Sequence, residues 1–388
     1  MSNETTSKTR TVRAALETDT QFGAVVPPIH LTSTFAFSGF GEKRTYDYSR
    51  SGNPTRDALA GALAELEGGV GAVVTASGMG AVSLVTQMFR PGQVAVVPHD
   101  CYGGTYRLFN ALRERGSLDV RFVDFQQPAA LDAALAGRPA LVWVETPSNP
   151  LLRIVDIASV AAAAHAVGAL VVADNTFLSP VWQQPIALGA DAVVHSTTKY
   201  LNGHSDVVGG AVIAARADLH ERLAWWANCV GVTGAPFDSY LTLRGLRTLH
   251  ARMRAHGENT LRVVEILARH PAVRHVYYPG LESHPGYSIA QAQQSGSGAM
   301  VSFELQGSVE HVKALLGSLH LFSLAESLGG VESLVAHPAS MTHAAMDPAA
   351  RERAGISDSL LRLSIGIEDG EDLVRDLERA LDAVQRLA

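Results

Sequence analysis

The sequence predicts an α/β fold in which a mainly parallel sheet is covered by helices on both faces, with a smaller α+β region after it. Short apolar runs rich in β-branched residues recur along the first two thirds of the 388 residues, and helix-like segments separate most of them. Apolar strands alternating with amphipathic helices are typical of a parallel sheet buried on both faces. After about residue 250 this alternation stops and a mixed strand and helix pattern begins.

The α/β region begins with a helix from Thr55, because the apolar residues of TRDALAGALAELEGG share one face and Gly68 and Gly69 are placed to end it. The strand-like runs that follow are GAVVT (71–75), QVAVVP (93–98), DVRFVDF (119–125), ALVWVE (140–145), ALVVAD (169–174), DAVVHS (191–196) and GGAVIAA (209–215). The helix-like segments between them include GMGAVSLVTQMF (78–89), LDAALAG (131–137) and DIASVAAAAHAVG (156–168). These runs predict a mostly parallel sheet of seven strands.

Three regions are predicted along the chain. Residues 1–55 are irregular and punctuated by glycine and proline, which suits an arm lying across another surface. Residues 56–250 form the α/β domain. Residues 251–388 carry GAMVSFELQG, VEHVKALLGSL, LRLSIGIE and EDLVRDLERALDAVQRL, which predict a smaller α+β domain.

The composition excludes several classes of function. The chain has 31 Lys and Arg against 38 Asp and Glu, a formal charge of −7, and no basic block, so neither nucleic acid nor a membrane is an expected partner. No apolar run approaches the roughly 20 residues of a membrane span, and the polar N-terminus lacks the apolar core of a signal peptide. Cys101 and Cys229 cannot form a disulfide framework, and no metal-type Cys/His spacing surrounds them. We therefore expect ordinary thiols, no metal, and a cytoplasmic protein.

Polar residues directly after the apolar runs indicate where the site lies. In an open parallel sheet, ligands bind beyond the carboxyl ends of the strands. The residues at these positions are Ser77, Gly78, Met79, Tyr102, Asn149, Asp174, Ser196, Thr198 and Lys199. Each also has an ordinary interpretation, such as a turn at Asp174, a helix cap at Ser77 or a solvated lysine at Lys199. Their joint occurrence at strand ends favours a single site.

An aromatic aldehyde that carries a phosphate and a ring nitrogen would use these residue types. A lysine can form a Schiff base with the aldehyde, a carboxylate can keep the ring nitrogen protonated, and an aromatic side chain can stack on the ring. Lys199, Asp174 and Tyr102 supply these three groups. Backbone amides at Gly78 and Met79, with nearby hydroxyl groups, would suit the phosphate. His195 and His204 are interpreted as structural.

The motifs of the chain resemble those of the Cys/Met-metabolism family of pyridoxal-phosphate (PLP) enzymes, and the resemblance covers nearly the whole sequence. They are VVPPIHLTSTF, YSRSGNPTR, SGMGA, HDCYGGTYR, ETPSNP, DNTFLSP, HSTTKYLNGHSD, AESLGGVESL and LRLSIGIEDGEDL. The resemblance implies the fold type I architecture, with pyridoxal 5'-phosphate as cofactor and a homotetramer built from dimers that share active sites.

Carried over position by position, the resemblance assigns roles to individual residues. Lys199, Asp174 and Tyr102 are similar to the Schiff-base lysine, the partner of the ring nitrogen and the stacking tyrosine. Five residues match the phosphate cup: Ser77, Gly78, Met79, Ser196 and Thr198. Tyr48 and Arg50 match residues that reach the phosphate of a neighbouring subunit. Arg362 matches the arginine that binds the substrate α-carboxylate, and four residues match positions bordering the substrate: Ser327, Asn149, Arg107 and Glu326.

Within the family, residues 223–249 and 324–334 resemble in particular the branch that performs γ-replacement. The implied reaction joins O-succinyl-L-homoserine and L-cysteine to give L-cystathionine and succinate, a step of transsulfuration in methionine biosynthesis. Gly104 stands where methionine γ-lyases carry a cysteine, and Glu326 where β-lyases tend to carry a bulky aromatic residue. In the implied mechanism Lys199 moves the protons, and Tyr102 or a neighbouring Tyr48 assists.

Other functions stay open at this point. A cystathionine γ-lyase or an O-acylhomoserine sulfhydrylase would use the same cofactor and nearly the same residues, and the preferred acyl group is not fixed. A dinucleotide-dependent oxidoreductase shares the alternating pattern, but the sequence lacks a glycine-rich triplet after the first strand with an acidic residue after the next. A non-catalytic binding protein would not need Lys199.

Overall fold

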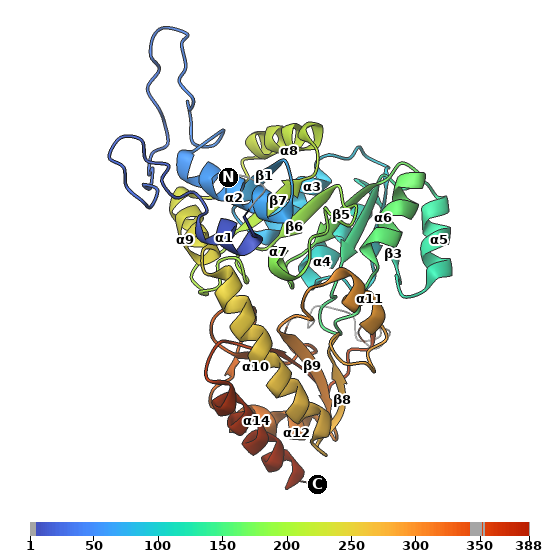
Figure 1. Ribbon diagram of the computed structural model, residues 1–388. Helices are drawn as coiled ribbons and strands as arrows, with labels where there is room; N and C mark the ends of the chain where they lie inside the picture. The colour runs from blue at the N-terminus through green and yellow to red at the C-terminus, as the bar shows by residue number, and fades with distance from the viewer. Residues whose placement is uncertain (1–4, 342–350, 352–353, 388) are drawn as a thin grey trace.

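Figure 1 shows the computed structural model, which describes residues 5–341, 351 and 354–387. A large part built on a seven-stranded sheet stands above a smaller part built on a five-stranded sheet, and helix α10 runs between them. Of the predicted regions, residues 1–4, 342–350, 352–353 and 388 lie outside the described residues. Within the described ranges, no helix is long and apolar enough to cross a membrane.

All seven apolar runs that predict strands form the large sheet. The strands are β1 (Gly71–Thr75), β2 (Val94–Pro98), β3 (Asp119–Val123), β4 (Leu141–Glu145), β5 (Leu170–Asp174), β6 (Ala192–His195) and β7 (Gly210–Ala214). Their order is β1-β7-β6-β5-β4-β2-β3. Strand β7 is antiparallel to both of its neighbours, and the other pairs are parallel. The predicted mostly parallel sheet is confirmed.

Helices cover both faces of this sheet, which explains why its strands are apolar throughout. The helices of this part are α2 (Pro54–Glu67), α3 (Gly78–Thr86), α4 (Gly103–Glu114), α5 (Pro128–Ala136), α6 (Ile157–Ala166), α7 (Ser179–Trp182), α8 (Ala217–Val230) and α9 (Pro236–Leu246). Along β4, Leu141 and Trp143 join the core under α3, α4 and α8, whereas Val142 and Val144 join the core under α5 and α6. This alternation follows the two-residue period of a strand.

Helix α2 has both of its ends encoded in the sequence. The side chain of Asn53 accepts hydrogen bonds from the N–H groups of Thr55 and Arg56, and Pro54 occupies the first turn, where no N–H is needed. Gly68 ends the helix with φ of 75°, a left-handed conformation that glycine adopts without a steric penalty. The helix predicted from Thr55 is therefore confirmed and begins at Pro54.

The smaller part is an antiparallel sheet with one parallel edge pair, packed against long helices. Its sheet has the order β10-β11-β12-β9-β8, and its long helices pack against it in one core (Figure 1). The strands are β8 (Val273–Tyr277), β9 (Met300–Leu305), β10 (Ser323–Leu324), β11 (Leu334–Ala336) and β12 (Leu360–Ser364). The helices are α10 (Leu249–Arg269), α11 (Tyr287–Gln293), α12 (Val309–Ser318) and α14 (Gly370–Gln385). The predicted smaller α+β region is confirmed.

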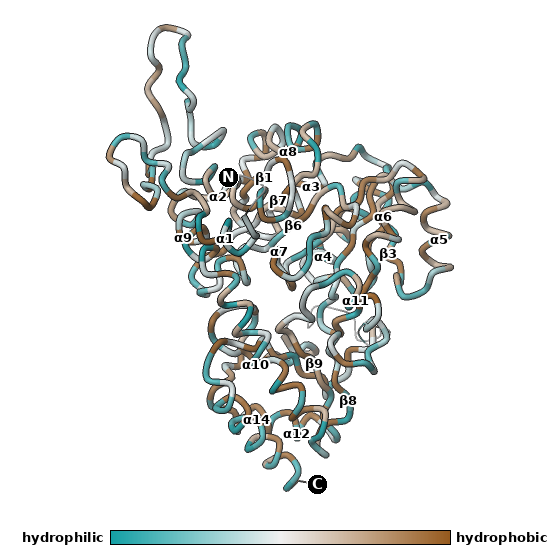
Figure 2. Tube along the Cα trace, in the orientation of Figure 1, coloured by the Kyte–Doolittle hydropathy of each residue, from teal (hydrophilic) through white to brown (hydrophobic). Residues whose placement is uncertain are grey.

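The segment before α2 projects from the large part. It holds the short helix α1 (Ser7–Val12), and its long loops extend away from the rest of the chain (Figure 1). Figure 2 shows hydrophobic stretches along these loops, and Phe22 and Phe40 are 83% and 108% exposed.

Asn53 joins this arm to α2, and we expect its loss to destabilise the fold. Its buried amide caps α2 and donates from Nδ2 to the carbonyl of His30 at 3.0 Å. Loss of such a cap costs about 1–2 kcal/mol, so Asn53→Ala should lower the thermal midpoint by roughly 2–4 °C. Midpoints should be compared at one protein concentration, because association also stabilises. Asn53→Asp keeps the capping oxygens and should lose less, whereas an unchanged midpoint for the alanine variant would contradict the assignment.

Candidate active site

One cavity of about 760 Å³ collects nearly all the residues that the sequence singles out. It opens at the carboxyl ends of the large sheet and is closed from the other side by residues of the small part. The predicted residues that line it are Ser77, Gly78, Met79, Tyr102, Arg107, Asn149, Asp174, Ser196, Thr198, Lys199, Glu326, Ser327 and Arg362. Strand ends far apart in the sequence thus meet at one place, as the parallel topology requires.

Lys199 follows β6 in a tight turn and points its amine at the small part. Its Nζ donates to Ser327 Oγ at 2.7 Å. Burial, helped by the positive charge of Arg362 and opposed by Glu326, lowers the pKa of Lys199 from its ordinary value to about 8. A sizeable share of neutral amine at physiological pH makes this lysine both a nucleophile and a base.

Asp174 ends β5 with its carboxylate toward the cavity. The Thr176 N–H donates to Asp174 Oδ1 at 3.0 Å. Burial raises the pKa of Asp174, while the hydrogen bonds from Thr176 and the charge of His195 oppose this rise. The hydroxyl of Thr176 in turn accepts from the Ser196 N–H at 3.0 Å, which ties the ends of β5 and β6 together.

The first turn of α3 provides an anion site. Ser77 caps this helix by accepting from the Gly80 N–H at 3.0 Å, and a helix N-terminus leaves further N–H groups without intrahelical partners. A Cβ on Gly78 would lie 2.7 Å from Ser196 Cβ, so only glycine allows the two segments to approach this closely. The Thr198 hydroxyl is engaged with the backbone of Gly209, at 3.2 Å to its carbonyl and 3.0 Å from its N–H.

Tyr102 begins α4, and its ring lies across a glycine. A Cβ on Gly104 would lie 2.6 Å from Tyr102 Cε1 and 2.8 Å from Met79 Sδ. Any side chain at position 104 would therefore displace the ring. The Tyr102 side chain is 44% exposed toward the cavity, which leaves one ring face available for stacking.

Arg362 on β12 brings a buried guanidinium to the cavity wall. Its Nη1 donates to Asn149 Oδ1 at 2.8 Å and its Nη2 donates to the Ser327 carbonyl at 2.9 Å. Burial lowers the pKa of Arg362 to about 10. Within the described ranges its Nε finds no hydrogen-bond partner. A buried cation with a spare N–H is suited to a carboxylate ligand.

The backbone at Ser327 is held in an uncommon conformation between these two cations. Its φ is 86°, in the left-handed region that non-glycine residues rarely adopt. The contacts of its hydroxyl with Lys199 and of its carbonyl with Arg362 hold it there. Ser327 thus fixes the separation of the amine and the guanidinium.

Tyr48 and Arg50 are not brought to this cavity. Both lie on the arm, where the Arg50 guanidinium sits 5.7 Å from the centre of the Tyr48 ring and donates to the Asn228 carbonyl at 2.9 Å. Tyr48 is 48% exposed. Neither residue therefore lines the cavity of its own chain.

The sequence reading missed two residues of the site, Glu145 and Thr176, which both line the cavity. Glu145 ends β4 as Asp174 ends β5, and the two are Cα partners in adjacent strands. The strand-end rule that selects Asp174 also applies to Glu145, so the sequence carries a signal for this residue. Thr176 follows Asp174 by two residues, a spacing at which a backbone N–H commonly bonds a turn carboxylate.

The side chains around the cavity fit a phosphorylated pyridine aldehyde. The lysine suits the aldehyde, Asp174 the ring nitrogen, Tyr102 the ring face and the α3 N-terminus the phosphate. The predicted structural roles of two histidines are consistent with their contacts: His195 bonds the buried Glu67 at 2.5 Å, and His204 bonds the Asn202 carbonyl at 2.7 Å. Across the described part of the chain, no three His, Cys, Asp or Glu side chains form a group able to hold a metal ion.

Comparison with known proteins gives similarity over nearly the whole chain. The family model for the Cys/Met metabolism PLP-dependent enzymes matches residues 8–382. Cystathionine gamma-synthase of Escherichia coli (strain K12) is 59% identical over 376 residues, 97% of each chain, and cystathionine beta-lyase of Coxiella burnetii is 47% identical over 375 residues, 96% of this chain and 97% of the relative. The crystal structure of cystathionine gamma synthase from Xanthomonas oryzae pv. oryzae in complex with cystathionine has a TM-score of 0.98 at 59% identity and covers 99% of this chain and 100% of that one.

The lowered pKa of Lys199 predicts an unusual reactivity in the cofactor-free protein. Acylation with a trace of acetic anhydride modifies only neutral amines, so the labelling rate of Lys199 should rise with pH to a midpoint near 8 and then level off. A short unstructured peptide with one lysine, added to the same mixture, is the control, and its labelling should keep rising well above that pH. Mass spectrometry of the labelled peptides measures both. A midpoint for Lys199 equal to that of the added peptide would contradict the prediction.

Proposed function

Because this chain belongs to the Cys/Met-metabolism family of PLP-dependent enzymes, we propose that it is a cystathionine γ-synthase. The reaction replaces the acyl group of O-succinyl-L-homoserine by the thiol of L-cysteine, which gives L-cystathionine and succinate. The similarity to the E. coli γ-synthase at 59% identity over 97% of both chains carries the proposal. The cavity geometry supports it, because the base, the carboxylate-binding group and the anion site face one another there.

The cofactor would be held at the ends of β5 and β6 and the start of α3. When bound, pyridoxal phosphate supplies a conjugated ring that takes up the electron pair left by removal of a proton from the amino acid. Asp174, aided by Thr176, would hold the ring nitrogen, and Tyr102 would lie on the ring. The phosphate would lie at the N–H groups of Gly78 and Met79 with the hydroxyls of Ser77, Ser196 and Thr198 around it.

Lys199 moves the protons of the reaction. With a pKa of about 8, its amine takes the proton from Cα of the acylated homoserine. Once that proton has been passed on to the conjugated system that the cofactor would supply, the neutral amine takes the proton from Cβ, which allows the Cγ–O bond to break and succinate to leave. The cysteine thiol then gives up its proton to the solvent and forms the Cγ–S bond, while succinate has left as a carboxylate. Lys199 returns the protons to Cβ and Cα.

Arg362 binds the α-carboxylate of the substrate. Two of its N–H groups are fixed by Asn149 and Ser327, so the guanidinium is oriented before the substrate arrives. Glu326 and Arg107 border the outer cavity and would contact the remaining polar groups of the two amino acids. Because both lie away from the sheet edge, they suit the second substrate and the acyl group.

The arm supports a shared active site in a homotetramer of two dimers. Residues 1–55 would form this arm, residues 56–250 the PLP-binding domain and residues 251–388 the C-terminal domain. The exposed Phe22 and Phe40 need a covering surface, and Tyr48 and Arg50 lie outside their own cavity. In the proposed assembly the arm lies on a second copy, and these two residues reach the phosphate in that copy. The exposed thiol of Cys229 suits a cytoplasmic location.

A spectroscopic assay with product analysis tests the proposed reaction. Protein reconstituted with pyridoxal phosphate should be yellow, change its spectrum with O-succinyl-L-homoserine, and release cystathionine and succinate once cysteine is added. Lys199→Ala should fold but lose at least about 10³-fold in turnover, because it removes the base. Degradation of cystathionine without its synthesis would make the protein a lyase, and use of inorganic sulfide in preference to cysteine a sulfhydrylase. A protein that takes up no cofactor would refute the assignment.

Substitution of Arg50 tests the shared site. Arg50→Ala should weaken retention of pyridoxal phosphate by roughly 10- to 100-fold, the loss expected of a charged hydrogen bond to the phosphate. Equilibrium dialysis against the free cofactor measures it. Arg44→Ala on the same arm is the matched control and should retain the cofactor as the wild type does. Equal retention by both variants would leave the arm without a role at the neighbouring site.

A further inference from the structure

Glu145 occupies a central position that none of the roles above assigns. It ends β4, is 6% exposed and lines the cavity beside Asp174. Its Oε1 and Oε2 accept the Tyr102 N–H at 3.0 and 2.9 Å, and the nearby backbone N–H of Asn149 also favours the ionised carboxylate. One buried side chain therefore holds the backbone of two site residues from different segments.

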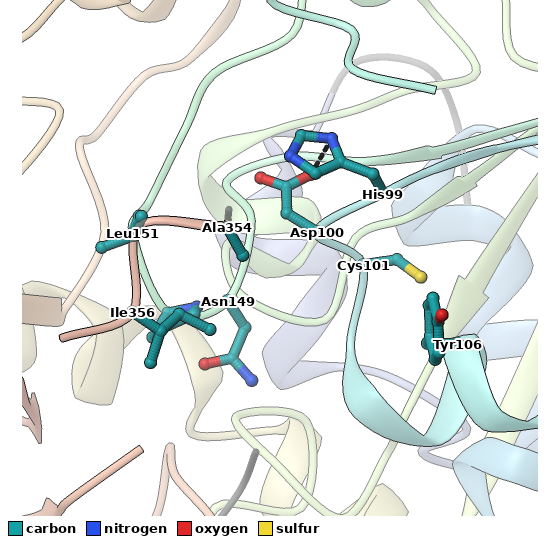
Figure 3. Close-up of a pocket in the computed structure, with 9 residues that line it drawn as sticks. His99, Asp100, Cys101, Tyr106, Asn149, Leu151, Ala354 and Ile356 are labelled. Carbon is teal, nitrogen blue, oxygen red and sulfur yellow. Dashed lines mark ion pairs between the residues drawn. The ribbon is translucent and has the colours of Figure 1, made fainter. Parts of the chain in front are cut away.

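The two segments that Glu145 joins are also joined from the opposite side. Asp100, two residues before Tyr102 in the chain, accepts from Ser148 Oγ at 3.0 Å and from Arg153 Nη1 at 2.9 Å. Figure 3 shows this side, with Asp100 and Cys101 on one segment facing Asn149 and Leu151 on the other across a small cavity of about 10 Å³. Asp100 thus fastens the segments at their outer edge, whereas Glu145 fastens them at the cavity.

From Asn149 the chain of contacts continues to the substrate-binding groups. Asn149 Oδ1 accepts from Arg362 at 2.8 Å, and Arg362 bonds the carbonyl of Ser327, whose hydroxyl accepts from Lys199. Tyr102 lies at the other end of this series. The same carboxylate, that of Glu145, therefore lies behind the position of the Tyr102 ring and the position of the Arg362 guanidinium.

The surroundings make a carboxylate at this position costly, which indicates a use for it. Burial and the neighbouring Asp174 raise the pKa of Glu145 well above its usual range, and the N–H groups of Tyr102 and Asn149 oppose the rise. A buried carboxyl beside a second one is unfavourable unless its hydrogen bonds compensate. Two backbone N–H groups at the rim of the cavity provide that compensation.

We propose that Glu145 is a positioning residue that sets the Tyr102 ring and, through Asn149, the Arg362 guanidinium in register with each other. In this role it acts through Tyr102 and Asn149 and not on the substrate itself. The proposal rests on the proposed function for the roles of Tyr102 and Arg362. It implies that one substitution at Glu145 changes both the environment of the bound cofactor and the binding of the substrate carboxylate.

The test compares Glu145→Gln with Asp100→Asn in the full chain loaded with pyridoxal phosphate. Glutamine keeps the size of the side chain but turns one acceptor into an NH₂ group facing the Tyr102 N–H. Glu145→Gln should alter the visible circular dichroism of the bound cofactor and raise the KM for O-succinyl-L-homoserine by roughly 10- to 100-fold, with a smaller change in kcat. Asp100→Asn loosens the same segments from the outside and should lower the thermal midpoint without either change.

A second pair of variants separates the two ends of the chain of contacts. Asn149→Ala should raise the KM but leave the dichroism unchanged, because the Glu145 contact to Tyr102 remains. Combined with Glu145→Gln, its effect on KM should be less than the sum of the two single effects in free energy. If Glu145→Gln does not fold, Glu145→Asp, which retains the charge but shortens the side chain, should shift both readouts in the same direction.

Two results would overturn the proposal. Either wild-type dichroism and KM in the folded Glu145→Gln variant, or the same changes in Asp100→Asn as in Glu145→Gln, would show that Glu145 acts only as general support for the loops. Failure of the proposed function gives a different result, because the dichroism of the cofactor needs no turnover. A wild type that binds the cofactor but makes no cystathionine would leave the dichroism comparison intact.

Discussion

The buried guanidinium of Arg362 is the contact on which the site depends. It joins β12 of the small sheet to Asn149, which follows β4 of the large sheet, and its side chain is 3% exposed. Burial of a cation is unfavourable unless its N–H groups are paired. Asn149 and Ser327 pair two of them, and a substrate carboxylate suits the Nε. The group whose burial opposes folding is therefore the group that prepares the cavity for its ligand.

The other charges of the cavity are arranged around this one. Arg362 and Lys199 lie toward the small sheet, while Asp174 and Glu145 lie side by side at the edge of the large sheet. The nearby cation helps burial to lower the pKa of Lys199 to about 8, and the adjacent carboxylates help burial to raise the pKa of Glu145. A cavity polarised in this way offers cationic groups to a carboxylate and the Asp174 carboxylate to a protonated ring nitrogen, so one set of charges both tunes the base and orients its ligands.

Much of the fold and of the site could be predicted from the sequence, because in this fold the functional residues follow directly after the strands. All seven apolar runs became strands, and the residues after them meet in one cavity. The direction of β7 could not be read from its composition, since a buried antiparallel strand is as apolar as a parallel one. The position of Glu145 could be predicted by the same strand-end rule, but its role could not, because its partners are backbone N–H groups, which leave no mark in the sequence. The strained φ of Ser327 likewise arises from contacts between distant segments.

On the proposed function, the residues at the edge of the large sheet do not determine whether γ-replacement or elimination takes place. Both outcomes need a base at Lys199 and a carboxylate partner at Arg362, and a β-lyase shares 47% of its residues with this chain. Replacement requires in addition that a second amino acid reach Cγ before the first one is lost. That step takes place in the outer cavity, between Arg107 on α4 and Glu326 near β10, and a neighbouring arm with Tyr48 and Arg50 would border it. The residues of the outer cavity and the association of two chains then determine the selectivity for replacement over elimination. The residues at the strand ends carry out the chemistry that is common to the family.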